Sequence, residues 1–263
     1  MKKPSALTIA GSDSGGGAGI QADLKTFAAH GVHGLSAIAA LTAQHTRGVT
    51  AVHVPDIGFL RAQVEACFDD FDIRAVKLGM LATTDVIRAV AGMLDAHRDV
   101  PVVLDPVMVA TSGAKLLADD ALDAMRTQLL PRATIATPNL PEAELLLGRT
   151  IGSVDAMRAA CTDLRNLGAH AVLLKGGHLP AGDVVDVFAD ASGLHDIVHP
   201  RLPIEAHGTG CTLASAIAAR LALGDDLRTA CIGASDYVHR ALVSGYRPGR
   251  SDILVLDHFG AMR

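Results

Sequence analysis

Short apolar runs alternate with longer segments of helical spacing along this chain. The runs are continuous, and they predict buried strands at 6–10, 75–79, 102–105, 134–137 and 171–175. Elsewhere apolar residues recur every three or four positions, which predicts helices at 20–30, 59–69, 84–97, 119–129, 141–147, 154–167, 211–223 and 226–243. Continuous apolar strands separated by helices are typical of a parallel sheet covered on both faces. We therefore expect an α/β protein.

Two further runs differ from this pattern. Residues 183–190 and 194–200 are separated only by a short turn that contains Ser192-Gly193, so they predict an antiparallel hairpin at the edge of the sheet. Neither a repeat nor a linker rich in proline, serine or charge divides the chain. We expect one domain over residues 1–263.

Composition excludes some function classes. The net charge is −5, aromatic residues make up 3% and tryptophan is absent, which disfavours nucleic-acid binding as the main activity. The apolar runs are shorter than the roughly 18 residues of a membrane span. The four cysteines form no C-x-x-C pair and lack zinc-ligand spacing with histidine, so we expect free thiols in a cytoplasmic protein.

Polar residues and glycines follow the predicted strands. The segment GSDSGGGAG follows the first strand, Met80 the second and Asp105 the third, while Asn139 with Glu142 follow the fourth and Lys175 ends the fifth. Ligands of parallel sheets bind beyond the carboxyl ends of the strands. The chain therefore predicts a site at this edge.

The first glycine-rich loop does not match a known phosphate motif well. It lacks the Gly-Lys-Ser/Thr ending of a P-loop. Residues 17–22 match G-x-G-x-x-A, but the acidic residue that a dinucleotide site needs about 20 positions later is missing. A flexible turn that leads into a helix would explain the glycines, although it leaves Asp13 and Asp23 on either side unexplained.

The segment HGTGCT at 207–212 places a cysteine where a helix begins. Gly208 and Gly210 permit a tight turn whose N–H groups, together with the helix N-terminus, could bind an anion. The same field should lower the pKa of the Cys211 thiol, which could then take a proton from a substrate hydroxyl. Two alternatives stay open: a small packed cysteine, or a covalent nucleophile with His207 as its base.

Three charged residues at strand ends favour phosphoryl transfer. Asp105 and Glu142 are carboxylates of the kind that hold Mg²⁺, and Lys175 is a cation for nucleotide phosphates. Taken singly, each could instead be a turn cap, a first-turn helix residue or a solvated strand end. Their joint placement beside an anion-binding loop is harder to explain without a ligand.

With these residues in view, the chain resembles the hydroxymethylpyrimidine/phosphomethylpyrimidine kinases, the branch of the ribokinase-like superfamily that serves thiamine biosynthesis. The resemblance rests on segments in family order: 6–27, ALTAQ-x-T at 40–46, KLGML at 77–81, LDPVM at 104–108, TPNLPEAELLL at 137–147, LKGGH at 174–178 and HGTGCT at 207–212. It implies a three-layer α/β/α sandwich with a mostly parallel sheet, and a homodimer.

The resemblance also implies an activity. It is the ATP- and Mg²⁺-dependent phosphorylation of 4-amino-5-hydroxymethyl-2-methylpyrimidine to its monophosphate and then to the diphosphate. A pyridoxal or pyridoxine kinase is the alternative within the class, because related kinases phosphorylate similar hydroxymethyl heterocycles. A non-catalytic pyrimidine-binding sensor is the alternative from another class.

Site roles are carried over residue by residue. Asp23 and Gln44 would hydrogen-bond the aminopyrimidine. The remaining implied roles are close approach to the ring for Gly11 and Ala18, apolar walls for Met80 and Val107, magnesium binding for Asp105 and Glu142, nucleotide phosphate binding for Asn139 and Lys175, an anion hole for Gly208, Thr209 and Gly210, and the base for Cys211. The chain departs from the family pattern at His45 and at Glu205-Ala206, outside these residues.

Overall fold

The computed structural model describes residues 3–110, 113–118 and 120–262. Its strands are β1 (Ser5–Asp13), β2 (His33–His45), β3 (Gly48–His53), β4 (Ile73–Leu78), β5 (Val102–Leu104), β6 (Ile135–Ala136), β7 (Val172–Leu174), β8 (Val184–Asp190), β9 (Gly193–His199), β10 (Ala206–His207) and β11 (Leu254–Val255). Its α-helices are α1 (Gly19–Ala29), α2 (Ile57–Asp70), α3 (Thr84–Leu94), α4 (Ala121–Ala124), α5 (Leu140–Leu147), α6 (Val154–Asn166), α7 (Thr209–Leu223) and α8 (Leu227–Val243). Helix α4 continues as a π-helical turn over Met125–Leu129.

The described strands β1 to β9 form one sheet in the order β3-β2-β1-β4-β5-β6-β7-β8-β9. The six strands from β2 to β7 in this order pair in parallel, and β3, β8 and β9 pair antiparallel at the two edges. All five strands predicted from the apolar runs lie in the parallel part, which confirms the predicted sheet.

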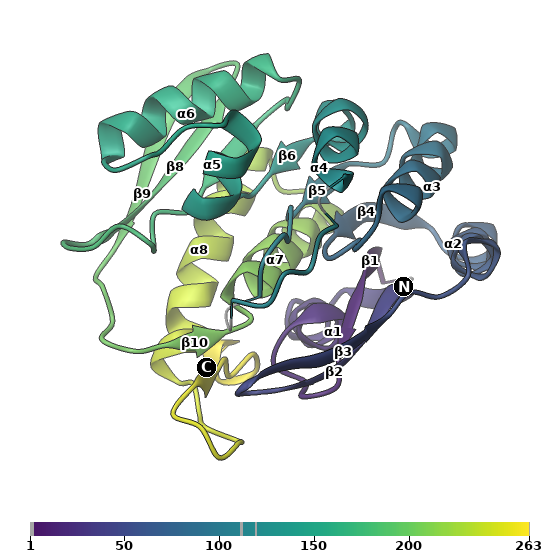
Figure 1. The fold of residues 1–263 in the computed structure, drawn as a ribbon, viewed down its shortest axis with the longest axis horizontal. Coiled ribbons are helices and arrows are strands. Elements are labelled where there is room, and N and C mark those ends of the chain that lie inside the picture. Colours follow the sequence, from purple (N-terminus) through teal and green to yellow (C-terminus); the bar gives the residue numbers. More distant parts are fainter. Residues whose placement is uncertain (1–2, 111–112, 119, 263) are drawn as a thin grey trace.

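Helices cover both faces of the sheet (Figure 1). Along β1, Leu7 and Ile9 pack with helices α2 to α6, whereas Ala6 packs with α1, α7 and α8 on the opposite face. The period of two sends successive side chains into two separate cores, and β4, β5 and β7 repeat it. The expected three-layer α/β/α architecture is confirmed. Within the described residues, no helix combines the length and hydropathy needed to cross a membrane.

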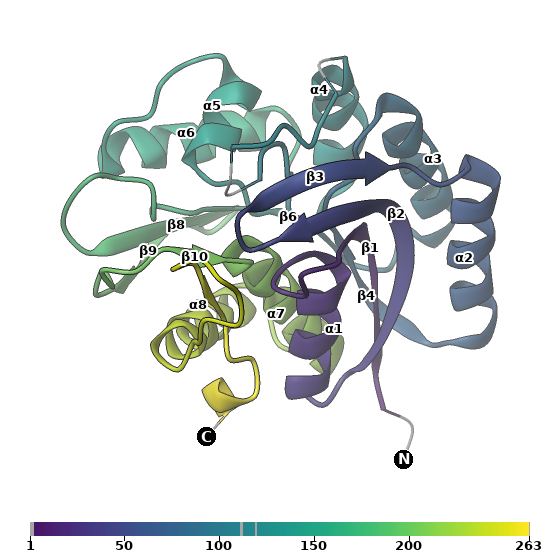
Figure 2. The same cartoon turned by 60° about the horizontal axis from the view of Figure 1, so that its bottom comes forward.

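The two edges of the sheet differ in how well they were predicted. The expected hairpin at 183–200 is β8–β9. The hairpin β2–β3 at the other edge was not predicted (Figure 2). Its first strand reads HGLSAIAALTAQH, and alanine is a poor strand former and a good helix former. This unpredicted strand carries Thr42 and Gln44 to the site.

Candidate active site

A cavity of about 450 Å³ opens at the carboxyl ends of the parallel strands. It joins segments that are distant in sequence: the loop after β1, the end of β2, the ends of β4 and β5, the start of α5, the loop after β7 and the start of α7. Thirteen of the fourteen predicted site residues line it: Gly11, Ala18, Gln44, Met80, Asp105, Val107, Asn139, Glu142, Lys175, Gly208, Thr209, Gly210 and Cys211. The exception is Asp23.

Two glycine-rich segments meet at the start of α7. Gly208 has φ +87°, and a Cβ added there would lie 1.9 Å from the carbonyl oxygen of Gly17. Only glycine allows both this backbone conformation and this approach. The loop after β1 also reaches the thiol, because the N–H of Gly19 donates toward the Cys211 sulfur. Close contact between the segments therefore sets the position of Cys211.

The electrostatic environment of Cys211 differs from the expectation. Burial raises the pKa of its thiol to about 11, and the carboxylates of Asp23 and Asp105 act in the same direction. The ammonium of Lys77 and the N–H of Gly19 oppose this increase but do not outweigh it. The predicted lowering of the thiol pKa by the helix N-terminus is thus wrong, since desolvation is the larger effect.

Asp23 lies beneath the cavity wall. Its side chain is fully buried, and its two carboxylate oxygens accept hydrogen bonds from Lys77 Nζ at 2.9 Å. They also accept from the hydroxyls of Thr8 and Ser215, each at 2.6 Å. The prediction that Asp23 binds the aminopyrimidine is wrong for this structure, because its oxygens are occupied by protein donors and it has no surface at the cavity.

Lys77 itself lines the cavity, and its ammonium acts electrostatically on the Cys211 thiol. Cys211 and Ser215 are one turn apart on α7, so one face of this helix carries both the thiol and the hydroxyl that binds Asp23. Asp23 therefore holds the Lys77 ammonium in place by hydrogen bonds, and this ammonium is the cation that acts on the Cys211 thiol. The motif KLGML contained this lysine, but its partner lies 54 residues away, and no local pattern indicates the pair.

The three charges predicted for phosphoryl transfer lie together. Lys175 Nζ is 3.0 Å from Asp105 Oδ1, and both side chains are largely buried. Burial would lower the pKa of Lys175, but the carboxylates of Asp105 and Glu142 outweigh this effect and raise it. Burial raises the pKa of Glu142 to about 7, with Asp105 adding to the increase and Lys175 opposing it. The group thus joins two carboxylates and one firmly charged ammonium.

Asn139 has a structural partner at the start of α5. Its Oδ1 accepts from the Glu142 N–H at 2.9 Å, and Glu142 Oε2 accepts from the Asn139 N–H at 2.8 Å. This capping box satisfies two N–H groups that the helix itself leaves unpaired. It fixes the Glu142 carboxylate at the cavity and ties the Asn139 side chain to the helix.

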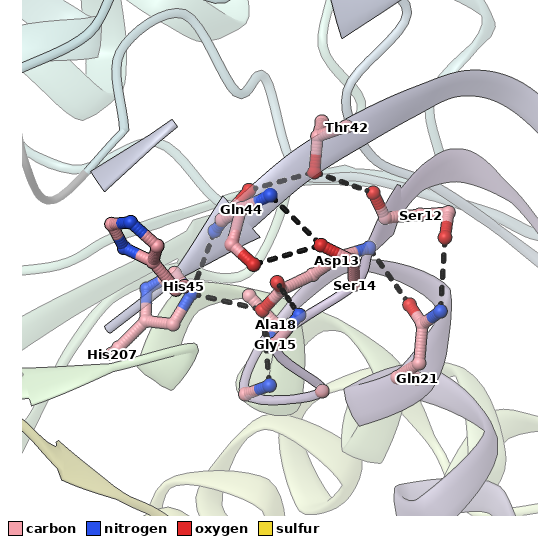
Figure 3. A network of polar contacts seen from close by, with 12 residues as sticks. Ser12, Asp13, Ser14, Gly15, Ala18, Gln21, Thr42, Gln44, His45 and His207 are labelled. Atoms are coloured by element: carbon pink, nitrogen blue, oxygen red, sulfur yellow. Dashed lines mark hydrogen bonds and ion pairs between the residues drawn. The ribbon is translucent and has the colours of Figure 1, made fainter. Parts of the chain in front are cut away.

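A polar network closes the cavity beside Gln44 (Figure 3). Asp13 accepts from the N–H groups of Gly15, Gly17 and Ala18 and from His207 Nε2, which also lies 2.9 Å from Gln44 Nε2. Burial would raise the pKa of Asp13, but the hydrogen bonds from His207, Ala18 and Gly15 lower it overall.

The motif HGTGCT indicated for His207 only the role of a possible base for Cys211. In the structure, its Nε2 faces Asp13 and Gln44 instead. Asp13 was noted beside the glycines without a role, and Thr42 was quoted only as part of the motif ALTAQ-x-T, also without a role. The signal available in the sequence was an acidic residue at the start of a glycine-rich loop, since a buried carboxylate can hold several backbone N–H groups.

Known proteins are similar to this chain in sequence and in fold. A family model described as phosphomethylpyrimidine kinase matches residues 13–255. A hydroxymethylpyrimidine/phosphomethylpyrimidine kinase of Rhizobium meliloti is 50% identical over 244 residues, covering 92% of this chain and 91% of that protein. The thiamine biosynthesis bifunctional protein ThiED of Geobacter sulfurreducens is 50% identical over 239 residues, covering 90% of this chain and 49% of that protein. The chain thus spans about half the length of this second relative.

Solved structures of two kinases are also similar to this chain. A phosphomethylpyrimidine kinase from Clostridium difficile 630 is 42% identical with a TM-score of 0.81, covering 91% of this chain and 99% of that one. A pyridoxal kinase from Staphylococcus aureus, in complex with AMP-PCP and pyridoxal, is 32% identical with a TM-score of 0.90, covering 99% and 95%. The expected ribokinase-like fold is confirmed. Together with the matched family model, these similarities show that the chain belongs to the phosphomethylpyrimidine kinase family.

Proposed function

We propose that this protein transfers the γ-phosphoryl group of ATP to 4-amino-5-hydroxymethyl-2-methylpyrimidine and then to the resulting monophosphate. The observation that carries the proposal is a cavity in which a thiol, a glycine turn at a helix N-terminus, a buried ammonium and two carboxylates meet. Relatives bear this activity in their names, and a structural neighbour was solved with an ATP analogue.

The residues of the cavity divide into two ends. Gly11, Ala18, Gln44, Met80 and Val107 supply backbone, apolar walls and one amide, which suits a small aromatic ring with polar edges. Lys175 and the start of α7 supply positive charge and N–H groups, which suits phosphates. The hydroxymethyl group would then lie between the two ends, near Cys211.

Mg²⁺ fits the residues present. It binds through one or two carboxylates, with waters and substrate phosphate oxygens completing its shell. Asp105, directly after β5, and Glu142, in the first turn of α5, supply two buried carboxylates, and Lys175 balances their charge. When bound there, the ion would neutralise charge on the phosphates.

The chain's own residues account for the remaining steps. The N–H groups at residues 208–211 would hold the phosphoryl group in transit, where pre-oriented donors stabilise developing charge. Cys211 would accept the proton of the hydroxymethyl oxygen as that oxygen bonds to phosphorus. Because the thiol pKa is about 11, little of Cys211 is thiolate at neutral pH. The ammonium of Lys77 is the fixed cation that favours the thiolate. The second transfer has an ionised phosphate as nucleophile and needs no such base.

Pyridoxal phosphorylation is a second candidate, favoured by the TM-score of 0.90 to a pyridoxal kinase solved with pyridoxal. Pyridoxal also presents a hydroxymethyl group on a heterocycle of similar size. The phosphate end of the cavity would serve both substrates, so the Gln44 end must decide between them. Higher identity to phosphomethylpyrimidine kinases favours the pyrimidine as the main substrate.

A coupled ADP-release assay with Mg²⁺-ATP tests the proposal. Hydroxymethylpyrimidine, its monophosphate, pyridoxal and no acceptor are compared on the wild type and on Cys211→Ala. We expect turnover to require an acceptor, and the alanine variant to lose about 10²–10⁴-fold in kcat on hydroxymethylpyrimidine, the range of a general base. The loss on the monophosphate should be much smaller. Release of ADP that no acceptor stimulates would refute the function.

We further propose that one domain carries this activity in a cytoplasmic homodimer. The edge strand β3 and the end of β2 expose Val52 and Leu41, which a second chain could cover. Sedimentation at micromolar concentration should then give twice the mass of one chain.

A further inference from the structure

The contacts around Gln44 conflict over the position of protons. His207 Nε2 lies 2.9 Å from Gln44 Nε2 and 3.1 Å from Asp13 Oδ2 (Figure 3). A ring nitrogen carries either a proton or a lone pair. With a lone pair it would accept from the amide but would face the lone pairs of a carboxylate. With a proton it would donate to Asp13 but would meet the amide N–H groups.

A second conflict lies at the other end of the same amide. The Thr42 hydroxyl is 2.9 Å from the carbonyl oxygen of Ser12 and 3.1 Å from Gln44 Oε1. Both of these atoms are acceptors, and a hydroxyl has one proton. The carbonyl of Ser12 can only accept, so it takes the proton. The atom of Gln44 that faces Thr42 must then be a donor.

One change resolves both conflicts. A half-turn of the Gln44 amide brings Oε1 to His207 and Nε2 to Thr42, positions that are nearly indistinguishable by shape. His207 Nε2–H then donates to Asp13 and to Gln44 Oε1, while Gln44 Nε2 donates to Thr42 and Thr42 to Ser12. In each of these four contacts a donor then faces an acceptor.

We infer that His207 is a specificity-determining positioning residue: held by Asp13, its Nε2–H fixes the Gln44 amide with oxygen toward His207 and nitrogen toward Thr42. Asp13 is itself fixed by three backbone N–H groups of the glycine-rich loop. The His207 ring packs against the same loop, since a Cβ on Gly17 would lie 2.9 Å from its Cδ2. The imidazole therefore has little freedom to turn.

The consequence for substrate choice rests on the proposed function. A 4-aminopyrimidine presents an amino donor beside a ring-nitrogen acceptor, and the fixed amide offers an acceptor beside a donor. A reversed Gln44 amide would place its N–H₂ against the amino group of the pyrimidine and its oxygen against the lone pair of the ring nitrogen. The ring cannot turn over to match it, because the hydroxymethyl group must face Cys211. Pyridoxal has no amino group beside its ring nitrogen, so its binding depends less on the orientation of Gln44.

The tautomer can be measured without any substrate. Long-range ¹H–¹⁵N spectra of the ligand-free protein, with His207 assigned by its absence in His207→Gln, report whether each ring nitrogen carries a proton. We expect a protonated Nε2. A lone pair on Nε2 would overturn the inference whatever the kinetics show.

Kinetics then test the role in specificity. His207→Phe keeps a planar ring but has no donor, whereas His207→Gln offers an amide N–H₂ that can reach both Asp13 and Gln44. In His207→Phe, kcat/KM for hydroxymethylpyrimidine should fall about tenfold or more, the cost of one lost and one opposed hydrogen bond. The fall should lie in the KM for the pyrimidine, with the KM for ATP unchanged, and His207→Gln should restore most of it.

Two further variants separate orientation from structure. Thr42→Val removes the other anchor of the amide and should lower the ratio of pyrimidine to pyridoxal kcat/KM in the same direction. Ser14→Ala removes only hydrogen bonds to the Gln44 backbone, each 2.8 Å long, and should leave this ratio unchanged. Equal losses on both substrates in His207→Phe and Thr42→Val would overturn the inference. A wild type without pyrimidine kinase activity would instead refute the proposed function and leave the tautomer result standing.

Discussion

Among single residues, Cys211 shows how burial and position compete. The thiol lies at a helix N-terminus and beside Lys77, yet burial raises its pKa to about 11. Because a raised pKa keeps the thiol neutral, its alkylation by iodoacetamide should rise about tenfold per pH unit from pH 7 to pH 10, following the thiolate fraction. Peptide mapping by mass spectrometry separates Cys211 from Cys67, and Cys211→Ser provides the blank. A rate that levels off below pH 8 would show a thiolate already formed.

The pair Lys77–Asp23 is a fully buried ion pair between strand β4 and helix α1. Lys77→Met leaves a carboxylate fully buried with two hydroxyl donors but no cation. Removal of one partner of a buried pair costs about 3–5 kcal/mol of unfolding free energy. Arg74→Met on the same strand breaks an exposed pair with Asp72 and should cost no more than about 1 kcal/mol. Urea unfolding at pH 7 measures both, and equal losses would contradict this account.

At the level of elements, the start of α7 depends on its contact with the loop after β1. Gly208→Ala places a Cβ against the Gly17 carbonyl, whereas Gly224→Ala, at the end of the same helix, has open space and a similar φ of +99°. Both variants should lose about 1–2 kcal/mol through the left-handed backbone. Only Gly208→Ala should also lose about 10² in kcat, because misplacing a reacting group by an ångström has an effect of that order.

Denaturation curves and the ADP-release assay on the same two variants separate stability from activity. A comparable loss of kcat in Gly224→Ala would show that α7 acts through its stability alone.

Local patterns predicted elements well and long-range pairs poorly. Helix α3 was visible because its apolar residues recur with helical spacing, and β5 because VVL is a continuous apolar run. Strand β2 was missed because alanine is its most frequent residue and because its buried side chains pack against segments that are distant in sequence.

The same distinction applies to the site. Residues that follow parallel strands, such as Asp105 and Lys175, could be predicted because topology alone brings them to one edge. Asp23 was assigned to the ligand from the family resemblance, and no local pattern indicated its pair with Lys77, which lies on another element. The role of His207 depends on Asp13, 194 residues earlier, so no spacing could indicate it.

For the whole molecule, residues at the ends of most of the parallel strands line the cavity. A ligand bound there should therefore stabilise the whole domain against unfolding. A ligand at about 100 times its Kd adds about 2.7 kcal/mol. For a chain of this size, that amounts to an increase in Tm of about 5–10 °C. ADP with Mg²⁺ should produce it in the wild type and in Cys211→Ala, because the thiol is not needed to hold phosphates.

Lys175→Met should lose most of this increase, measured from its own ligand-free Tm by calorimetry, since the ammonium beside Asp105 is the cation that we propose to bind the phosphates. ADP without Mg²⁺ should give a smaller increase in the wild type, because the carboxylates of Asp105 and Glu142 would then repel the phosphates. An equal increase in the wild type and Lys175→Met would place the nucleotide elsewhere. An equal increase with and without Mg²⁺ would remove the two carboxylates from metal binding while leaving the kinase assignment intact.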